Sequence, residues 1–271
     1  MPIVCAVVSS PDSVAATAEE AFRREYGRGP GRPVCVVIAA LNEAESVAAV
    51  VRSIPGEVCG LATECILVDD GSTDTTSDQA RLAGALVCRL DTNLGQGLAL
   101  RSGYRLAASR RATVIVTMDA DGQFDAAELD RLVSPVVSGQ ADMVNGSRRL
   151  GRSETTDPVR SAGLVLFGGL VSLLTGTRVT DPANGFRAFT PDLAERVPLR
   201  QPQYQTSELL IGALALGYRV VEVPVTVRPR AAGQSKKGHN LLYGYRFGRA
   251  VMTTWWSLRG SDVGGRARRR R

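Results

Sequence analysis

Three side chains that could bind a metal stand two residues apart: Asp119, Asp121 and Gln123, directly after an apolar run. Carboxylate and amide oxygens are the hard ligands that Mg²⁺ and Mn²⁺ prefer in proteins. Two carboxylates held close together repel each other unless a cation offsets them, and a divalent ion that also binds a diphosphate does so. The triplet therefore predicts a metal site and, through the metal, a site for a nucleoside diphosphate.

Two further polar clusters follow apolar runs in the same way. Asn42-Glu43 follow the first run of the main domain, and Asp69-Asp70 follow the second. Ligands of open parallel sheets bind beyond the carboxyl ends of the strands, so we expect the three clusters to converge on one crevice. For Asp69-Asp70 taken alone, a role in a turn or a helix cap is an equal alternative.

The elements that must position these clusters are parallel strands connected by helices, because short apolar runs alternate with amphipathic stretches. Strands are predicted at 34–39, 65–68, 85–90, 114–118 and 142–145, and helices at 44–53, 75–83, 97–109 and 126–137. Asp125 and Glu128 have the spacing of a capping box at the start of the last helix. No P-loop motif is present and Gly95-Gln96-Gly97 lacks the dinucleotide fingerprint, which argues against P-loop ATP hydrolysis and NAD binding.

The 271 residues are 44% hydrophobic, enough to bury a core, and they divide into three predicted parts. Residues 1–32 are an extension with a helix from Pro11 to Glu25, residues 33–240 are the main domain, and residues 241–271 are a C-terminal helix and basic tail. The five cysteines are odd in number and form no C-x-x-C pair, which favours buried, reduced thiols in a cytosolic protein.

The net charge of +6 is concentrated in the tail, where six arginines stand between Arg259 and Arg271. This tail either binds anionic lipid or is simply solvated, and a nucleic-acid partner is not expected. The apolar stretch 162–174 is shorter than the roughly 20 residues that a membrane-spanning helix needs. It is either a core helix or an interfacial one, and Trp255-Trp256 suit a membrane interface.

The motifs, taken in order, resemble those of the inverting GT-A glycosyltransferases, and within them the dolichyl- and polyprenyl-phosphate sugar synthases of the dolichol-phosphate mannosyltransferase type. The resemblance rests on the segments 34–43, 68–72, 93–97, 119–123, 146–148, 181–187, 222–225 and 230–236. It implies an α/β fold of the GT-A kind, a Rossmann-like, mostly parallel sheet flanked by helices, with a C-terminal helix or hairpin region on the acceptor side.

The resemblance also implies roles for single residues. The nucleotide sugar would be bound by Ala39, Leu41, Glu43, Val68, Asp70, Asp119, Ala120 and Asp121. Mg²⁺ or Mn²⁺ would be bound by Asp119, Asp121 and Gln123, and the phosphates of donor or acceptor by Arg148, Arg160, Arg230 and Lys236. Members of the family usually have proline at the position of Ala39 and often lysine at that of Gln96, so the nucleotide and the sugar stay open.

The predicted function is transfer of a hexose from a GDP- or UDP-sugar to a polyprenyl phosphate, by a protein in peripheral contact with the inner face of the cell membrane. Asp121, Arg148 and Glu208 are the predicted catalytic residues. The alternative is a soluble hydroxyl acceptor, in natural-product or polysaccharide biosynthesis, which needs a carboxylate base such as Glu208 or Asp181. Both carboxylates could equally serve in a cap or an ion pair. A second alternative is a non-catalytic protein that binds nucleotide sugars.

Overall fold

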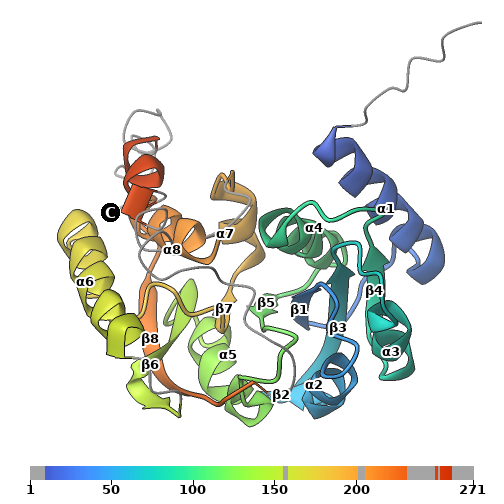
Figure 1. The fold of residues 1–271 in the computed structure, drawn as a ribbon, viewed down its shortest axis with the longest axis horizontal. Coiled ribbons are helices and arrows are strands. Elements are labelled where there is room, and N and C mark those ends of the chain that lie inside the picture. Colours follow the sequence, from blue (N-terminus) through green and yellow to red (C-terminus); the bar gives the residue numbers. More distant parts are fainter. Residues whose placement is uncertain (1–9, 155–157, 201–204, 231–247, 250, 258–271) are drawn as a thin grey trace, which may run out of the picture.

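Eight strands form one sheet in the part of the chain that the structure describes (Figure 1). This computed structural model describes residues 10–154, 158–200, 205–230, 248–249 and 251–257, and only the backbone of 158–161. The strands are β1 (Val34–Ala40), β2 (Glu57–Val58), β3 (Leu61–Asp69), β4 (Leu86–Arg89), β5 (Val114–Thr117), β6 (Met143–Ser153), β7 (Arg187–Phe189) and β8 (Val220–Val227). The helices are α1 (Pro11–Tyr26), α2 (Val47–Ser53), α3 (Thr76–Leu82), α4 (Gln96–Ser109), the 3₁₀ turn η1 (Ala126–Glu128), α5 (Leu129–Val137), α6 (Pro158–Thr175), α7 (Pro191–Arg196) and α8 (Gln205–Ala215).

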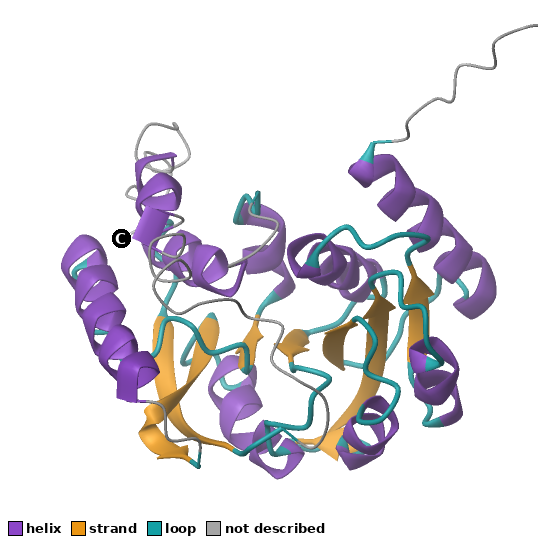
Figure 2. Cartoon of the chain, viewed as in Figure 1, coloured by secondary structure: helices purple, strands orange, loops and turns teal. Residues whose placement is uncertain are grey.

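The sheet is mostly parallel, as predicted. Its order is β3-β1-β5-β7-β6-β8, with β4 parallel to β3 and the short β2 antiparallel to the start of β3. Strand β7 is antiparallel to both β5 and β6, and β8 runs parallel to β6. Helices cover both faces of the sheet (Figure 2). The five predicted strands are all present, whereas β2, β7 and β8 were not predicted from the sequence.

Burial on both faces explains why the strands are continuous apolar runs rather than alternating ones. In β1, Cys35 and Val37 pack into a cluster with α1, α4 and α8, whereas Val34, Val36 and Ile38 pack into a second cluster with α2 and α5. Each face of the strand therefore packs into its own core. The first residues that could contact a ligand are the polar ones that follow the strand.

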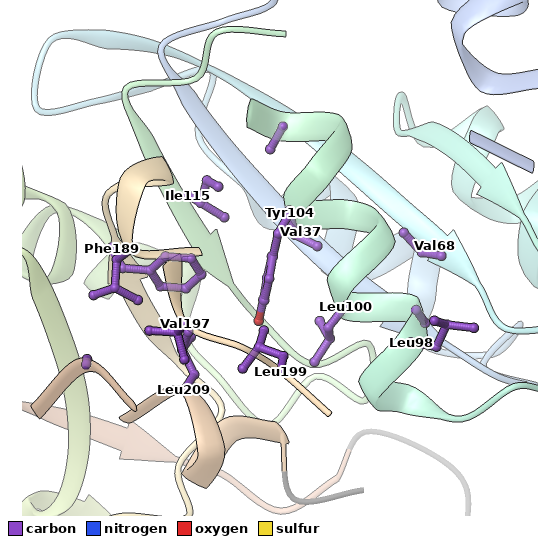
Figure 3. Packing of buried hydrophobic residues seen from close by; sticks show 14 of the residues in the cluster. Val37, Val68, Leu98, Leu100, Tyr104, Ile115, Phe189, Val197, Leu199 and Leu209 are labelled. Carbon is purple, nitrogen blue, oxygen red and sulfur yellow. The ribbon is translucent and has the colours of Figure 1, made fainter. Parts of the chain in front are cut away.

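Tyr104 of α4 packs within the first of these cores, beside Phe189 of β7 (Figure 3). Its ring meets Phe189 of β7 edge-on, with 5.1 Å between the ring centroids. The Tyr104 hydroxyl accepts a hydrogen bond from Gln205 Nε2 at 3.0 Å, at the first residue of α8. Burial raises the pKa of this phenol. The contact fixes where α8 begins.

Helix α1 lies over the edge strand β4 and packs against α4. It begins where the sequence predicts, with Ser10 Oγ accepting from the Ser13 N–H at 3.2 Å, and it ends one residue after the predicted Glu25. The hydroxyl of Tyr26 accepts from the Val87 N–H of β4 at 3.3 Å, so the helix satisfies part of an exposed sheet edge. The division of the chain at residues 32 and 240 stays a prediction.

The predicted capping box is half right. Asp125 Oδ1 accepts from the Ala127 N–H at 3.1 Å and caps the 3₁₀ turn η1. Glu128, however, accepts from the N–H and hydroxyl of Thr226 in β8, at 2.8 and 3.0 Å. A partner distant in the sequence has replaced the local one, and the helix proper begins at Leu129.

Three cysteines are buried and free, as predicted: Cys35, Cys65 and Cys88. Cys59 is exposed, so the prediction of burial is wrong for that residue, which lies in the turn between β2 and β3 with φ of 53°. Cys5 lies outside the described residues.

Helix α6 lies at the end of the sheet formed by β6 and β8 (Figure 1). Three apolar side chains on it are strongly exposed: Val165 (53%), Leu166 (69%) and Leu173 (82%). Of the two tryptophans, Trp255 packs into the core, while Trp256 is 67% exposed. Among the described residues, no helix has both the length and the apolar character to cross a bilayer.

Candidate functional site

The carboxyl ends of β1, β3 and β5 lie side by side at one edge of the sheet, because β1 is parallel to both of its neighbours. The Asp70 N–H donates to the Ala40 carbonyl at 2.8 Å, and the Asn42 N–H donates to Ser72 Oγ at 2.9 Å. Strand β5 runs beside β1 up to Thr117. The three polar segments therefore leave the sheet at the same edge, as the sequence predicts.

The two aspartates that end β3 hold loops. Asp69 is fully buried and accepts from the Ser72 N–H at 2.8 Å and from the Ser77 hydroxyl. Asp70 accepts from the two N–H groups of the 94–95 turn at 2.8 and 2.9 Å. Burial raises the pKa of Asp70 and the charge of Asp69 adds to the rise, while the two N–H groups oppose it. The contacts of Asp69 are those of a turn residue, the alternative considered from the sequence. Asp70 also holds the 93–97 motif in place through the backbone N–H groups of that motif.

The remaining predicted nucleoside-binding residues lie around the same edge. Ala39, Leu41 and Glu43 are partly exposed at the end of β1, and the Glu43 N–H donates to Thr76 Oγ1 at 2.8 Å. The side chain of Val68 is fully buried in the core, so only its backbone could face a nucleoside. Ala120, between the two aspartates of the predicted metal site, is 4% exposed.

Asp119 lies against the loop before β7. A Cβ atom added to Gly185 would stand 3.3 Å from Asp119 Oδ1, and the Thr117 hydroxyl donates to the Gly185 carbonyl at 2.6 Å. Only glycine leaves the carboxylate this much room. The 181–187 motif therefore approaches the predicted metal site from the antiparallel half of the sheet.

Asp121 is nearly buried and pairs with a cation. Its Oδ2 lies 3.0 Å from Arg230 Nη2, and its Oδ1 accepts from the Gln123 N–H at 3.1 Å. The side chain of Gln123 donates through Nε2 to the Arg228 carbonyl at 3.0 Å. The third predicted metal ligand therefore holds the chain segment that carries Arg230.

Arg148 and Asp181 form an ion pair. Arg148 Nε lies 2.7 Å from Asp181 Oδ2, Nη2 donates to Oδ1 at 3.4 Å, and the Arg148 N–H also donates to Oδ2 at 3.1 Å. The Asp181 side chain is fully buried and that of Arg148 is 17% exposed. The buried carboxylate of Asp181 therefore fixes the position of the Arg148 side chain.

Glu208 sits in the first turn of α8 and is 4% exposed. Its Oε1 accepts from the Arg200 N–H at 2.8 Å, so it serves as a cap for the segment before the helix. The backbone of Arg160 lies in the first turn of α6 while its side chain is not described, and Lys236 lies outside the described residues.

Two charged residues that organise this region were given no role from the sequence. Arg187 is fully buried and donates to the carbonyls of Pro182 and Thr206. Burial lowers its pKa to about 10, which leaves it charged at neutral pH. Glu222 of β8 accepts from the backbone N–H groups of residues 180 and 181 at 2.7 and 3.1 Å. The signal that could have found Arg187 is a single charge inside the apolar run 186–189.

The donor set fits a hard divalent cation. Mg²⁺ is usually bound by one or two carboxylates together with substrate phosphates and water rather than by an all-protein cage. Asp119, with the space that Gly185 leaves, and the nearly buried Asp121 supply such a pair of carboxylates. Within the described residues, no group of three or more His, Cys, Asp or Glu side chains could hold a metal. A metal here would thus need the diphosphate as a further ligand.

Comparison with known proteins identifies the family. The family described as "Glycosyl transferase family 2" matches residues 35–197. The chain belongs to glycosyl transferase family 2. This membership confirms the resemblance noted in the sequence and makes the protein a glycosyltransferase, so the alternative of a non-catalytic binding protein is dropped.

Proteins with related sequences or structures are similar to this chain over most of their length. The dolichyl-phosphate hexose transferase of Haloferax volcanii is 32% identical over 75% of this chain and 86% of its own length. The undecaprenyl-phosphate mannosyltransferase of Micrococcus luteus is 30% identical over 87% of this chain and 98% of its own. The glucosyl-3-phosphoglycerate synthase of Mycobacterium tuberculosis, solved with Mn²⁺, UDP and glucosyl-3-phosphoglycerate, superposes with a TM-score of 0.64 and 26% identity. That match covers 92% of this chain and 85% of the synthase, and it confirms the GT-A fold.

Proposed function

We propose that this family 2 glycosyltransferase moves a hexose from a GDP- or UDP-sugar to a polyprenyl phosphate. The observation that carries the proposal is the state of Asp181, whose carboxylate is buried and held by Arg148 through two side-chain contacts. A phosphate acceptor is already an anion at neutral pH and needs no base, whereas a hydroxyl needs a carboxylate that can take its proton. The names of two relatives, which state dolichyl-phosphate and undecaprenyl-phosphate substrates, support the same reading.

The donor would bind at the edge formed by β1, β3 and β5. The backbone at Ala39 and Leu41, with Glu43, Val68 and Asp70, would hold the nucleoside, and Asp119, Ala120 and Asp121 the diphosphate side. Asp119, Asp121 and Gln123 would hold Mg²⁺ or Mn²⁺. When bound, such a cation offsets the charge that develops on the departing diphosphate. The Mn²⁺ and UDP in the synthase from M. tuberculosis support this assignment.

The acceptor phosphate would meet arginine and lysine side chains. Arg148 uses Nε and Nη2 on Asp181, which orients the guanidinium, and its fork has further N–H donors that can bind phosphate. Arg230, Arg160 and Lys236 are the other proposed ligands of donor or acceptor phosphate. Because the phosphate nucleophile is already an anion, the role of these cations is to hold the phosphate behind the anomeric carbon. The rate enhancement then comes from positioning rather than from proton transfer.

A soluble hydroxyl acceptor is the second candidate. It is favoured by the structural neighbour, which was solved with glucosyl-3-phosphoglycerate, the glucoside of a soluble acid. In that case Glu208 would be the base, although its Oε1 accepts from the Arg200 N–H.

The exposed apolar face of α6 supports peripheral membrane contact. Val165 and Leu166 are adjacent in the sequence, and Leu173 follows seven residues after Leu166, about two helical turns, so the three exposed side chains lie on one face of α6. An interfacial helix buries such a face among lipid headgroups. We expect the protein to float with liposomes of anionic lipid, and Leu166→Asp with Leu173→Asp to lose flotation. Equal flotation of the double variant would contradict this contact.

An acceptor assay tests the proposed reaction. Purified protein is incubated with Mn²⁺, labelled GDP- or UDP-hexoses, and either polyprenyl phosphate or 3-phosphoglycerate. The proposal expects label in the organic phase that depends on the lipid phosphate. Label only in a water-soluble glycoside would replace it with the hydroxyl-acceptor function.

A further inference from the structure

The carboxylate of Asp121 has an observed charged partner, Arg230, and a proposed one, the metal ion. Nη2 of Arg230 lies 3.0 Å from Oδ2 of Asp121. The side chains of Asp121 and Arg230 are only 6% and 24% exposed, so water screens this pair less than it screens a surface ion pair. Arg230 thus supplies in the protein itself part of the positive charge that a cation would bring.

Arg230 is also held in place by its chain segment. The Arg228 N–H donates to the Gln123 carbonyl at 2.9 Å, and Gln123 Nε2 donates back to the Arg228 carbonyl at 3.0 Å. Phe124 and Val227 form a bridge next to them. The segment that carries Arg230 is therefore paired with the segment that follows Asp121, and the ion pair is built into this pairing.

A divalent cation on Asp121 would stand beside the guanidinium of Arg230, and the two positive charges repel each other. A nucleoside diphosphate changes this balance, because its oxygens can bind the cation and the guanidinium together. We propose that Arg230 is an internal counterion of Asp121 that opposes binding of the cation alone and so makes the cation and the nucleoside diphosphate bind cooperatively. This inference rests on the proposed metal site at Asp119 and Asp121.

Linkage makes the inference measurable without any catalysis. If the diphosphate increases the affinity for the cation, the cation increases the affinity for the diphosphate by the same factor. Binding of Mn²⁺ is measured from the free-ion signal in electron paramagnetic resonance, with and without UDP or GDP. For the wild-type protein we expect weak binding of Mn²⁺ alone and an increase of at least about tenfold with nucleotide.

The deciding variant is Arg230→Met. We expect Mn²⁺ alone to bind at least about fivefold tighter than to the wild type, and the coupling between Mn²⁺ and nucleotide to fall by a similar factor. Arg228→Met is the matched control, because it removes the same charge from the same segment while its partner is Asp125, with Nη2 and Oδ2 at the short contact of 2.5 Å. The control should change the affinity for Mn²⁺ less than twofold, roughly the level of an exposed ion pair.

Two results would overturn the inference in different ways. If Arg230→Met binds Mn²⁺ alone no tighter than the wild type but loses affinity for UDP or GDP, Arg230 is a diphosphate ligand and not a counterion. If the wild type fails to bind Mn²⁺ even with both nucleotides present, the proposed metal site fails and the counterion role falls with it. Thermal unfolding of each variant shows whether the fold is retained.

Discussion

Arg148 of β6 and Asp181 of the loop before β7 form an ion pair in which the carboxylate is fully buried. Glu222 binds the backbone N–H of Asp181, so the anchor of the pair is itself fixed by β8. This arrangement sets the direction of the Arg148 guanidinium before any ligand arrives. Breaking the pair should therefore change the free energy of unfolding of the protein.

Removal of Arg148 should leave a buried charge without its partner. We expect Arg148→Met to lower the free energy of unfolding by about 3 kcal/mol, and the double variant Arg148→Met, Asp181→Asn to recover part of that loss. Urea unfolding monitored by circular dichroism measures both. A single variant as stable as the wild type would show that the carboxylate of Asp181 does not depend on Arg148.

Arg187 connects the loop before β7 with the start of α8 through the carbonyls of Pro182 and Thr206. Arg187→Met should cost at least about 3 kcal/mol of unfolding free energy, because two buried carbonyl groups lose a charged donor. Lysine keeps the charge but cannot donate in two directions from a planar fork, so Arg187→Lys should recover only part of the loss. Full stability of the lysine variant would contradict this account of the geometry.

Gly185 tests the position of Asp119. In Gly185→Ala the new Cβ would stand 3.3 Å from Asp119 Oδ1, so the carboxylate must shift. We expect the affinity for Mn²⁺ in the presence of UDP or GDP to fall roughly 10-fold, as it does when groups that orient metal ligands are changed. The control is Gly56→Ala, since nothing lies within 4 Å of a Cβ there. Equal effects of both variants would remove the link between Gly185 and the metal.

Glu208 separates the two acceptor hypotheses. With a phosphate acceptor, Glu208→Gln should keep the rate of transfer within about threefold, because the amide oxygen can still accept from the Arg200 N–H and no proton has to be taken. With a hydroxyl acceptor, loss of the base should lower the rate by about 100-fold or more. The initial rate with each acceptor decides between these outcomes.

The sheet and its polar edge could be predicted because their signals are local. A strand such as β1, covered on both faces, is an unbroken apolar run, and the polar residues after it mark where the cover ends. Helix α1 could also be predicted from the sequence, because Ser10 and Pro11 mark its start and Gly27, with φ of 82°, follows its end.

The parts that escaped prediction depend on contacts between distant residues. Strand β7 has three residues and carries the buried Arg187, so neither its length nor its composition is typical of a strand. The partners of Arg148 and Glu128 lie 33 and 98 positions away, which no local pattern reveals. Sequence reasoning could therefore name several charged residues of the site, but it missed Arg187 and Glu222 and could not say which residues are already paired.

The rate of transfer by Asp121→Ala tests the central claim most directly. Formation of labelled lipid from polyprenyl phosphate is compared for wild type, Asp121→Ala and the control Asp125→Ala, which removes a neighbouring carboxylate that pairs with Arg228. We predict that Asp121→Ala lowers the rate at least about 100-fold while the protein stays folded, because the charge of the departing diphosphate is no longer offset. A rate for Asp121→Ala equal to that of the wild type would contradict the assignment of this carboxylate to the metal and diphosphate.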